Sequence, residues 1–222
     1  MRAVIFDLWE TLVDWPREEA AANYAELAQT VGVEPARFEA AWVEARAERE
    51  IGPLLEATRS IVRSLGAGDH VVERVLDVRR EHTRKMLRPR PGAVETLAEL
   101  RNRGFRVGLI SACSGDVPDV WPQTALAPLV EEPIFSCSVG FSKPDPRIYA
   151  AAAERLGVEP SACLFVGDGA NDELAGAERA GMKAVLILRP GETEPPWEEA
   201  RGWQPRITSI PEVLQLVPER PA

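Results

Sequence analysis

The sequence predicts an α/β protein, a doubly wound parallel sheet into which an all-helical segment is inserted. Short apolar, β-branched runs recur along the chain and are too short and too continuous for amphipathic helices, so they indicate buried parallel strands. Helical patterns lie between these runs, and three of them end at Gly104, Gly157 and Gly181, where a helix C-terminus favours a left-handed residue. Strands and helices that alternate in this way are typical of a doubly wound sheet.

The apolar runs define the strands, and the patterns between them define the helices. In chain order the strands are expected at residues 3–8, 105–110, 133–137, 163–166 and 184–188. The intervening helices are expected at residues 93–103, 145–156 and 171–180, and a short strand and helix within residues 206–217 would close the fold. Ligands of such sheets bind beyond the carboxyl ends of the strands, so the functional residues are expected just after each strand.

Residues 14–88 contain no strand-like run and are dominated by Ala, Glu, Arg and Leu, which predicts helices throughout. We therefore expect an α/β core of residues 1–13 and 89–222 and a separate helical unit of residues 14–88. Phe38 and Trp42 lie four residues apart, so they would pack on one face of a helix. The helices of this unit are expected to begin at or near Arg17, Pro35 and Pro53, and after Asp69 as an N-cap.

Composition and charge exclude several kinds of partner. The chain has 222 residues, of which 45% are hydrophobic, enough for a sizeable core. Its formal net charge of −9 offers no basic surface to nucleic acid, and anionic membranes should repel it. No apolar stretch approaches the roughly 20 residues of a membrane span. We therefore expect a cytoplasmic protein that binds a small molecule and has no nucleic-acid or membrane partner.

Cysteine and histidine chemistry is not indicated. Cys113, Cys137 and Cys163 are odd in number, far apart and outside any CxxC spacing, which argues against a disulfide framework and against a zinc site. His70 and His82 are the only histidines, and both fall in a stretch that is typical of a surface helix. A Ser-His-Asp triad is therefore not expected.

Four short motifs place chemically active side chains where apolar runs end. They contain Asp7 in VIFDLWETL, Ser111 in VGLIS, Lys143 in FSKPDP, and Asp168 with Asp172 in LFVGDGAND. Each alone is a weak signal, because an aspartate after a strand is often a helix cap. Carboxylates can share a pocket only if cations offset them, since like charges about 4 Å apart cost several kcal/mol at an effective dielectric near 20. The combination therefore indicates a site in which Lys143 and a metal ion balance the acids.

This arrangement resembles the haloacid dehalogenase superfamily over essentially the whole chain, with a Rossmann-like core and with residues 14–88 matching the helical cap that the family inserts after its first strand. The resemblance implies a hydrolase whose nucleophile is Asp7, which attacks phosphorus or carbon and forms a covalent aspartyl intermediate that water hydrolyses. It also implies that Ser111 and Thr11 bind the phosphate. Lys143 would neutralise charge on the nucleophile and on the transferring group.

The same resemblance implies Mg²⁺ as the cofactor. The ligands that it implies, direct or through water, are Asp7, the backbone carbonyl of Trp9, Asp168 and Asp172. A hard, oxygen-seeking cation suits carboxylates that converge at strand ends. The substrate that follows is a small phosphorylated metabolite, although a fold alone does not fix which one.

The nucleophile motif departs from the family pattern at two positions. Phosphatases of the family carry a second aspartate two residues after the nucleophile, which protonates the leaving group. Here that position is Trp9, and the usual glycine after it is Glu10. Because general acid–base catalysis contributes roughly 10² to 10⁴ in rate, turnover on alkyl phosphates is expected to be low. A competing hypothesis is that Glu10, with its longer side chain, replaces the missing acid.

Two other functions stay open at this point. The dehalogenase branch of the family has an aromatic residue at the position of Trp9, because a halide leaves without a proton, so a 2-haloacid dehalogenase is one alternative. A phospholigand-binding protein with low turnover is the other. Against dehalogenation, the loop from Asp168 to Asp172 resembles the metal-binding loop of the phosphatases, whereas the metal-free dehalogenases lose the first of these acids. We therefore favour Mg²⁺-dependent hydrolysis of a phosphoester or an acyl phosphate.

Overall fold

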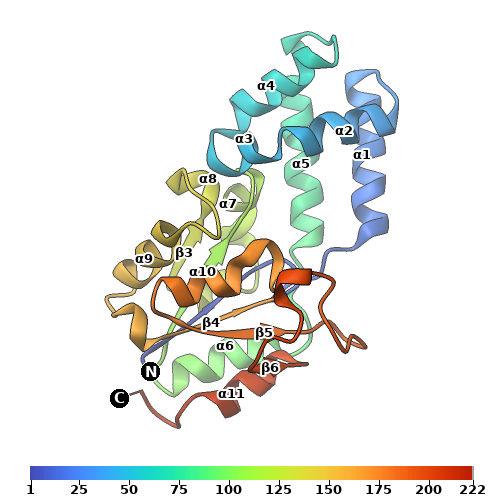
Figure 1. Cartoon of the computed structure of the whole chain (residues 1–222). Helices are drawn as coiled ribbons and strands as arrows, with labels where there is room; N and C mark the ends of the chain where they lie inside the picture. The colour runs from blue at the N-terminus through green and yellow to red at the C-terminus, as the bar shows by residue number, and fades with distance from the viewer. Residues whose placement is uncertain (222) are drawn as a thin grey trace.

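The computed structural model describes residues 1–221, and its centre is a six-stranded sheet in which every strand is parallel to its neighbours (Figure 1). Side by side, the strands are β3 (Glu132–Phe135), β2 (Arg106–Ser111), β1 (Ala3–Phe6), β4 (Cys163–Gly167), β5 (Lys183–Ile187) and β6 (Arg206–Ile207). The chain builds outward from β1 to β3 and then outward again from β4 to β6, so the order reverses between β1 and β4. This topology confirms the predicted doubly wound, Rossmann-like α/β fold.

Helices and short turns connect the strands. The helices outside residues 14–88 are α6 (Ala93–Asn102), α7 (Asp116–Val120), α8 (Ser136–Val139), α9 (Pro146–Arg155), α10 (Glu173–Arg179) and α11 (Val213–Leu216). The 3₁₀ turns are η1 (Asp69–Val71), η2 (Trp121–Gln123), η3 (Ala127–Leu129), η4 (Pro160–Ala162), η5 (Ala170–Asp172), η6 (Glu198–Ala200) and η7 (Ile210–Glu212). None of the helices within residues 1–221 is long and apolar enough to cross a membrane.

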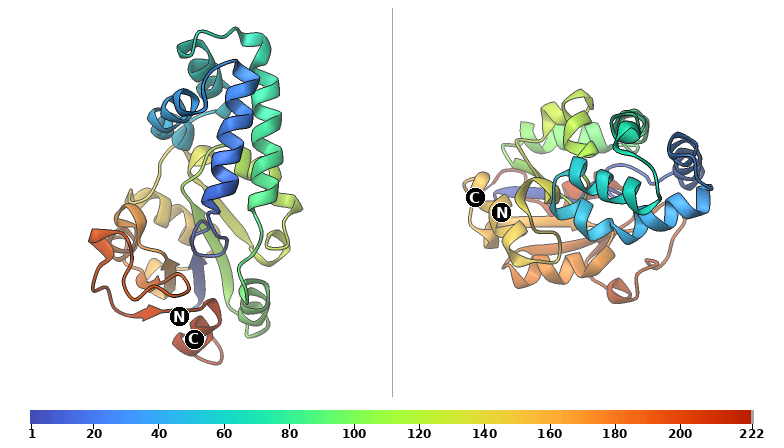
Figure 2. Two further views of the ribbon diagram at one scale, coloured as in Figure 1. Left: turned by 90° about the vertical axis from the view of Figure 1, so that its right-hand side faces the viewer. Right: turned by 90° about the horizontal axis from the view of Figure 1, so that it is seen from above.

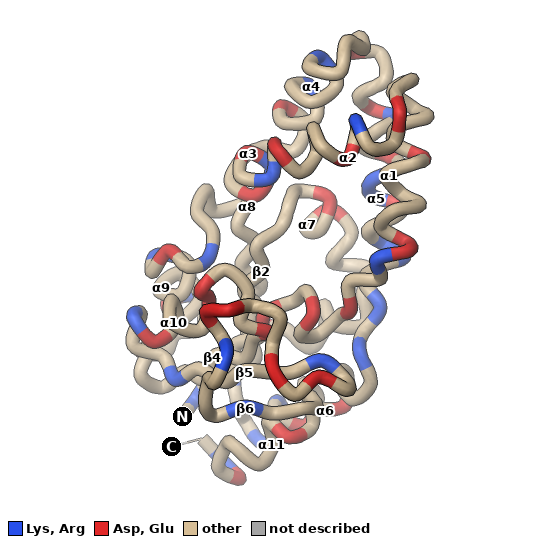
Figure 3. The backbone as a smooth tube through the Cα atoms, turned by 45° about the vertical axis from the view of Figure 1, so that its right-hand side comes forward, with Lys and Arg blue, Asp and Glu red and all other residues tan. Residues whose placement is uncertain are grey.

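Residues 14–88 form five helices above the carboxyl edge of the sheet: α1 (Arg17–Val31), α2 (Pro35–Glu44), α3 (Arg46–Ile51), α4 (Leu54–Ser64) and α5 (Val72–Met86). Figure 2 shows the long helices α1 and α5 lying side by side, and Figure 3 shows basic and acidic residues together on α3 and α5. The five helices bury a hydrophobic cluster of their own, in which Phe38 stacks on Trp42 with ring centroids 5.8 Å apart.

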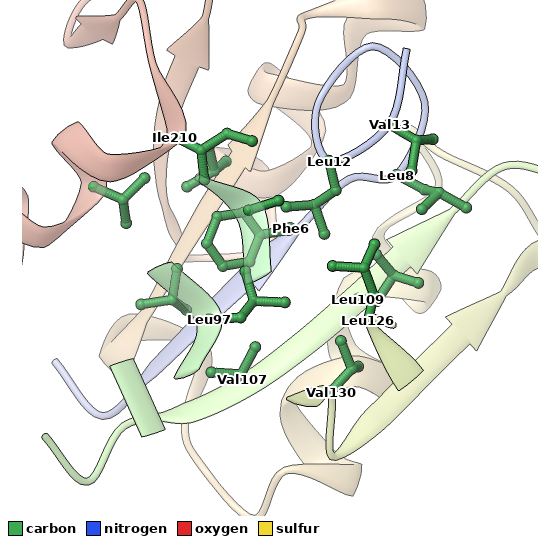
Figure 4. Packing of buried hydrophobic residues seen from close by; sticks show 14 of the residues in the cluster. Phe6, Leu8, Leu12, Val13, Leu97, Val107, Leu109, Leu126, Val130 and Ile210 are labelled. Atoms are coloured by element: carbon green, nitrogen blue, oxygen red, sulfur yellow. The ribbon is translucent and has the colours of Figure 1, made fainter. Parts of the chain in front are cut away.

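Hydrophobic clusters also lie on both faces of the sheet, because successive strand residues point to opposite sides. On one face, Phe6 of β1 and Val107 of β2 lie in the same cluster as Leu97 of α6 (Figure 4). On the other face, Ile5 of β1 lies in a cluster with Tyr149 of α9. Strands buried on both sides in this way explain the continuous apolar runs of the sequence.

The structure corrects two expected helix starts. The helix expected from Asn171 begins at Glu173, because Asn171 and Asp172 both adopt left-handed backbone conformations, with φ of 53° and 57°. Asp69 does not cap α5 with its side chain. Its carboxylate instead forms an ion pair with Arg63 at 2.6 Å, and α5 begins at Val72 after a 3₁₀ turn.

Candidate active site

The carboxyl ends of the two central strands bring Asp7 and Asp168 together. β1 ends at Phe6 and its neighbour β4 ends at Gly167, so the next residue of each strand lies at the same edge of the sheet. The backbone N–H of Asp7 donates to the carbonyl of Val166 at 2.8 Å, which continues the pairing of the strands up to the site. Both aspartates are buried. The reversal of strand order between β1 and β4 therefore lies directly beneath them.

A third carboxylate, that of Glu173, completes the cluster. Oxygens of Asp7, Asp168 and Glu173 all lie within 4.8 Å of one another. The Nζ of Lys143 donates to both Asp7 and Glu173, so the lysine lies between these two acids. An oxygen-only set of converging carboxylates suits a hard cation such as Mg²⁺ better than zinc or another thiophilic metal. The geometry of this buried acidic cluster is that of a group that could hold a metal ion.

Burial and mutual repulsion set the protonation of the cluster. Burial raises the pKa of the Asp7 carboxyl, although contact with Lys143 opposes the shift, and the charge of Asp168 adds to it. Burial likewise raises the pKa of Glu173 to about 8. Burial alone would lower the pKa of Lys143, but Asp7 and Glu173 reverse that effect and raise it. Three carboxylates around one ammonium group carry excess negative charge when ionised, and a bound divalent cation would offset that charge.

Asp172, expected as a metal ligand, lies outside this cluster. Its carboxylate forms an ion pair with Arg179 at 3.0 Å, and its side chain is 45% exposed. The two consecutive left-handed residues, Asn171 and Asp172, turn the Asp172 side chain outward. Glu173, the first residue of α10, enters the cluster in its place.

Sequence reasoning missed Glu173, although two features of the sequence point to it. Glu173 lies four residues before the buried Ala177, on the face of α10 that packs against the sheet. The strand beneath it ends in Gly167, and a Cβ at that position would lie 2.1 Å from the carboxylate of Glu173. The glycine therefore makes room for the acid.

Hydrogen bonds from the surrounding loops hold the acids in place. The Asp168 carboxylate accepts from the backbone N–H of Ala170 at 3.1 Å and from Trp197 Nε1 at 2.7 Å. The Glu173 carboxylate accepts from the backbone N–H of Gly169 at 2.9 Å. Trp197 belongs to the loop after β5, so this loop orients an acid of the cluster.

The nucleophile loop places Trp9 and Glu10 beside the cluster. The rings of Trp9 and Trp15 meet edge to face, with centroids 5.0 Å apart. Glu10 has a φ of 60°, a left-handed conformation that glycine adopts without strain. Its half-buried carboxylate lies 3.5 Å from Arg189, and burial raises the pKa of this carboxyl. The backbone at Glu10 is held by Arg90, which donates to its carbonyl oxygen at 2.7 Å.

A cavity of about 710 Å³ separates this edge of the sheet from helices α1, α2, α3 and α5. Its walls include the sequence-predicted residues Asp7, Trp9, Lys143 and Asp168, together with Glu173, Trp197 and Arg189.

The remaining expected site residues, Thr11, Ser111 and Asp172, are not among the described residues that line this cavity. The hydroxyls of Thr11 and Ser111 are buried and have no hydrogen-bond partner within residues 1–221. Their assignment to phosphate binding stays a prediction.

Known proteins resemble this chain in sequence. Residues 1–181 match the haloacid dehalogenase-like hydrolase family. The chain is 37% identical over 106 residues to a glyceraldehyde 3-phosphate phosphatase of Methanopyrus kandleri, with 46% of this chain and 45% of that protein aligned. It is 36% identical over 138 residues to (S)-2-haloacid dehalogenase 4A of Burkholderia cepacia, with 60% of this chain and 57% of that protein aligned. The chain thus spans about half the length of these two relatives.

The fold has known counterparts as well. A 2-haloacid dehalogenase of Pseudomonas syringae pv. Tomato DC3000 superimposes with a TM-score of 0.74 at 22% identity, and 97% of each chain is covered. This likeness shows a shared fold from end to end. Since the family match includes the nucleophile loop, the helical segment and the acidic loop after β4, the chain belongs to the haloacid dehalogenase-like hydrolases.

Proposed function

We propose that the protein is a Mg²⁺-dependent hydrolase of a small phosphorylated metabolite. The observation that carries this proposal is the convergence of Asp7, Asp168 and Glu173 around one edge of the sheet, with Lys143 between two of the acids. The similarity to a glyceraldehyde 3-phosphate phosphatase supports the same reaction class. We further propose that residues 14–88 act as a cap over the site, because α1, α2, α3 and α5 form the opposite wall of the cavity.

In the proposed reaction, Asp7 attacks the phosphorus atom and forms an aspartyl phosphate. The bond from phosphorus to the leaving oxygen breaks, and water then hydrolyses the intermediate to release inorganic phosphate and restore the carboxylate. The ammonium of Lys143 contacts Asp7, so it would hold the nucleophile and balance charge on the transferring group. Mg²⁺, when bound, would supply further charge neutralisation at the phosphoryl oxygens. Asp168 and Glu173 are its proposed ligands together with Asp7.

Protonation of the leaving group is the weak step of this mechanism. Trp9 lies two residues after Asp7, where the resemblance to the phosphatases of the family implies a general acid, and an indole cannot supply a proton to an alkoxide. Glu10 is a neighbouring carboxyl that lines the cavity, and its raised pKa favours the protonated form that an acid needs. Its ion pair with Arg189 favours the ionised form and opposes that role. We therefore propose that acyl and aryl phosphates, whose leaving groups need little protonation, are the better substrates.

Hydrolysis of a 2-haloacid is the second candidate. Two observations favour it: the aromatic residue at position 9 and the 36% identity to (S)-2-haloacid dehalogenase 4A. In that reaction Asp7 would attack the carbon that bears the halogen, and the halide would leave without a proton. The acidic cluster opposes this candidate, because a buried site rich in carboxylates repels a carboxylate substrate unless a cation is bound.

A substrate panel with and without Mg²⁺ tests the proposal. The panel contains p-nitrophenyl phosphate, acetyl phosphate, alkyl phosphates and 2-chloropropionate, and the Asp7→Asn variant serves as the control. We expect Mg²⁺-dependent release of phosphate from the first two compounds, and loss of that release in Asp7→Asn. Metal-independent release of chloride from 2-chloropropionate, without release of phosphate, would replace the phosphatase proposal by the dehalogenase one.

A further inference from the structure

The buried guanidinium of Arg49 faces the same cavity as Asp7. Arg49 lies on α3, is only 7% exposed, and contributes to the wall opposite the sheet edge. Its Nε and Nη2 donate to the carbonyl of Trp42 at 3.3 and 2.9 Å, and its Nη1 donates to the hydroxyl of Ser114 at 3.3 Å. These bonds use three of the five N–H groups of the guanidinium. The remaining two have no hydrogen-bond partner within the described chain.

No carboxylate of residues 1–221 forms an ion pair with Arg49. The acid on the adjoining helix α7, Asp116, is already fully engaged. It is completely buried and accepts from Arg79 at 2.7 Å, from Thr83 at 2.5 Å and from Ser114 at 2.5 Å. Asp116 therefore neutralises Arg79, and Arg49 reaches this network only through the neutral hydroxyl of Ser114.

An aromatic face partly compensates the two cations. The Cζ of Arg49 lies 4.2 Å from the ring centroid of Trp42, and the Cζ of Arg79 lies 5.0 Å from it. Burial, together with the charge of Arg79, lowers the pKa of Arg49 to about 10. The guanidinium therefore stays charged at neutral pH, although burial makes the charged form less favourable than it is in water. A buried cation without a counter-charge is unfavourable unless an anion binds beside it. Within residues 1–221, the helical wall of the cavity thus contains a buried guanidinium that forms no ion pair with a carboxylate.

We propose that Arg49 binds a carboxylate of the substrate, so that the protein acts on small phosphorylated carboxylic acids. This inference rests on the proposed phosphatase function. The phosphoryl group would lie at the sheet edge beside Asp7 and Lys143, and the carboxylate would lie at the opposite wall. The planar guanidinium presents its N–H groups in a fork that matches a carboxylate. A cavity of about 710 Å³ is in the size range of sites for small molecules.

A purely structural role is the competing explanation. The carbonyl of Trp42 belongs to the last turn of α2, so the Arg49 guanidinium also satisfies a helix end. Such a role would affect every substrate equally. Binding of a carboxylate would instead affect only substrates that carry one. The ratio of two catalytic efficiencies therefore separates the explanations.

The test compares kcat/KM for 3-phosphoglycerate and glyceraldehyde 3-phosphate, which differ in having a carboxylate or an aldehyde at the end remote from the phosphate. We expect the wild type to prefer 3-phosphoglycerate by at least about tenfold. The Arg49→Gln variant should lose that preference through an increase in KM for the acid, and Arg49→Lys should restore part of it. The matched control Arg59→Gln, whose side chain is paired with Glu56 on α4, should keep the wild-type ratio.

Each remaining result counts against the proposal. A wild type with no preference for the acid overturns it, whether or not Arg49→Gln folds. An unchanged ratio in a folded Arg49→Gln variant, checked by thermal melting, shows a structural role alone. Hydrolysis of p-nitrophenyl phosphate is measured in parallel: if it occurs without a preference for the acid, only the role of Arg49 fails. If none of these phosphate esters is hydrolysed, the proposed function itself fails.

Discussion

Replacing Glu173 by Gln should weaken Mg²⁺ binding about 100-fold, whereas replacing the adjacent Asp172 by Asn should change it little. The oxygens of Asp7, Asp168 and Glu173 lie within 4.8 Å of one another, so each acid contributes to the field at one cation position. A divalent cation and a carboxylate about 5 Å apart attract each other by about 7 kcal/mol at an effective dielectric of about 20. Lys143 contacts Glu173 and offsets much of this attraction. A net loss of about 2 to 3 kcal/mol corresponds to about 100-fold in Kd.

Isothermal titration calorimetry with Mg²⁺ measures both variants. Gln has nearly the shape of Glu, and its carbonyl oxygen can still accept from the backbone N–H of Gly169, so Glu173→Gln should fold. The charge of Asp172 is screened by solvent and already paired with Arg179, which makes this variant a matched control. Equal losses in the two variants, or a larger loss in Asp172→Asn, would refute the placement of Glu173 in the cluster.

Three further outcomes follow from the geometry. Trp197→Phe removes the donor to Asp168 and should weaken Mg²⁺ binding about tenfold or more by calorimetry, whereas Trp203→Phe should not, because the Trp203 N–H has no hydrogen-bond partner within residues 1–221. Glu10→Gly relieves a φ of 60° and should raise the free energy of unfolding in urea by about 1 kcal/mol, whereas Glu10→Ala, which keeps the strain, should not raise it. Burial lowers the pKa of His82 from 6.5 to about 4, so acid protonates the unfolded chain first and stability falls as the pH drops from 6.5 towards 4. His82→Gln should lose less stability than the wild type between about pH 7 and about pH 5, and equal losses would contradict this.

The strands of the sheet could be predicted from the sequence because each strand corresponds to one short run of consecutive residues. A parallel strand covered on both faces is a continuous apolar run, and five such runs place five of the six strands to within one residue at each end, with two exceptions. The strand β1 ends at Phe6, two residues before the expected residue 8, and β3 ends at Phe135, two residues before the expected residue 137. The strand β1 stops at the residue before Asp7, and β3 stops at the residue before α8. The apolar pattern continues past the paired residues of these strands because Leu8 and Ser136 are buried and Cys137 is half-buried. The apolar pattern of the sequence thus predicts which residues are buried more closely than it predicts which residues pair with a neighbouring strand.

The acidic site could be predicted only in part. Asp7 and Asp168 were accessible to sequence reasoning because each directly follows a strand, β1 or β4. Lys143 lies in the loop between α8 and α9, and its motif FSKPDP indicated it. The choice between Asp172 and Glu173 depends on two left-handed residues, a conformation that Asn and Asp tolerate but do not require. The spacing of Glu173 from Ala177 and the glycine at position 167 agree with Glu173 as the inward acid, but neither feature excludes Asp172 before the backbone conformation is known.

Contacts between distant segments were beyond sequence reasoning for a different reason. Trp197 lies 29 residues after Asp168, and Arg49 lies 65 residues before Ser114, yet each pair forms a hydrogen bond. These bonds depend on how the loop after β5 and the helix α3 fold back over the sheet edge. Such placement follows from tertiary packing, which a single sequence does not specify.

The covalent intermediate tests the central claim most directly. Enzyme with Mg²⁺ is mixed with excess p-nitrophenyl phosphate, quenched in acid within one turnover, and digested, and the peptide that contains Asp7 is examined by mass spectrometry. We expect a phosphoryl group on Asp7 in the wild type, formed as p-nitrophenol is released, and none in Asp7→Asn. Release of p-nitrophenol with an unmodified Asp7, or with the phosphoryl group on another residue, would contradict the assignment of Asp7 as the nucleophile.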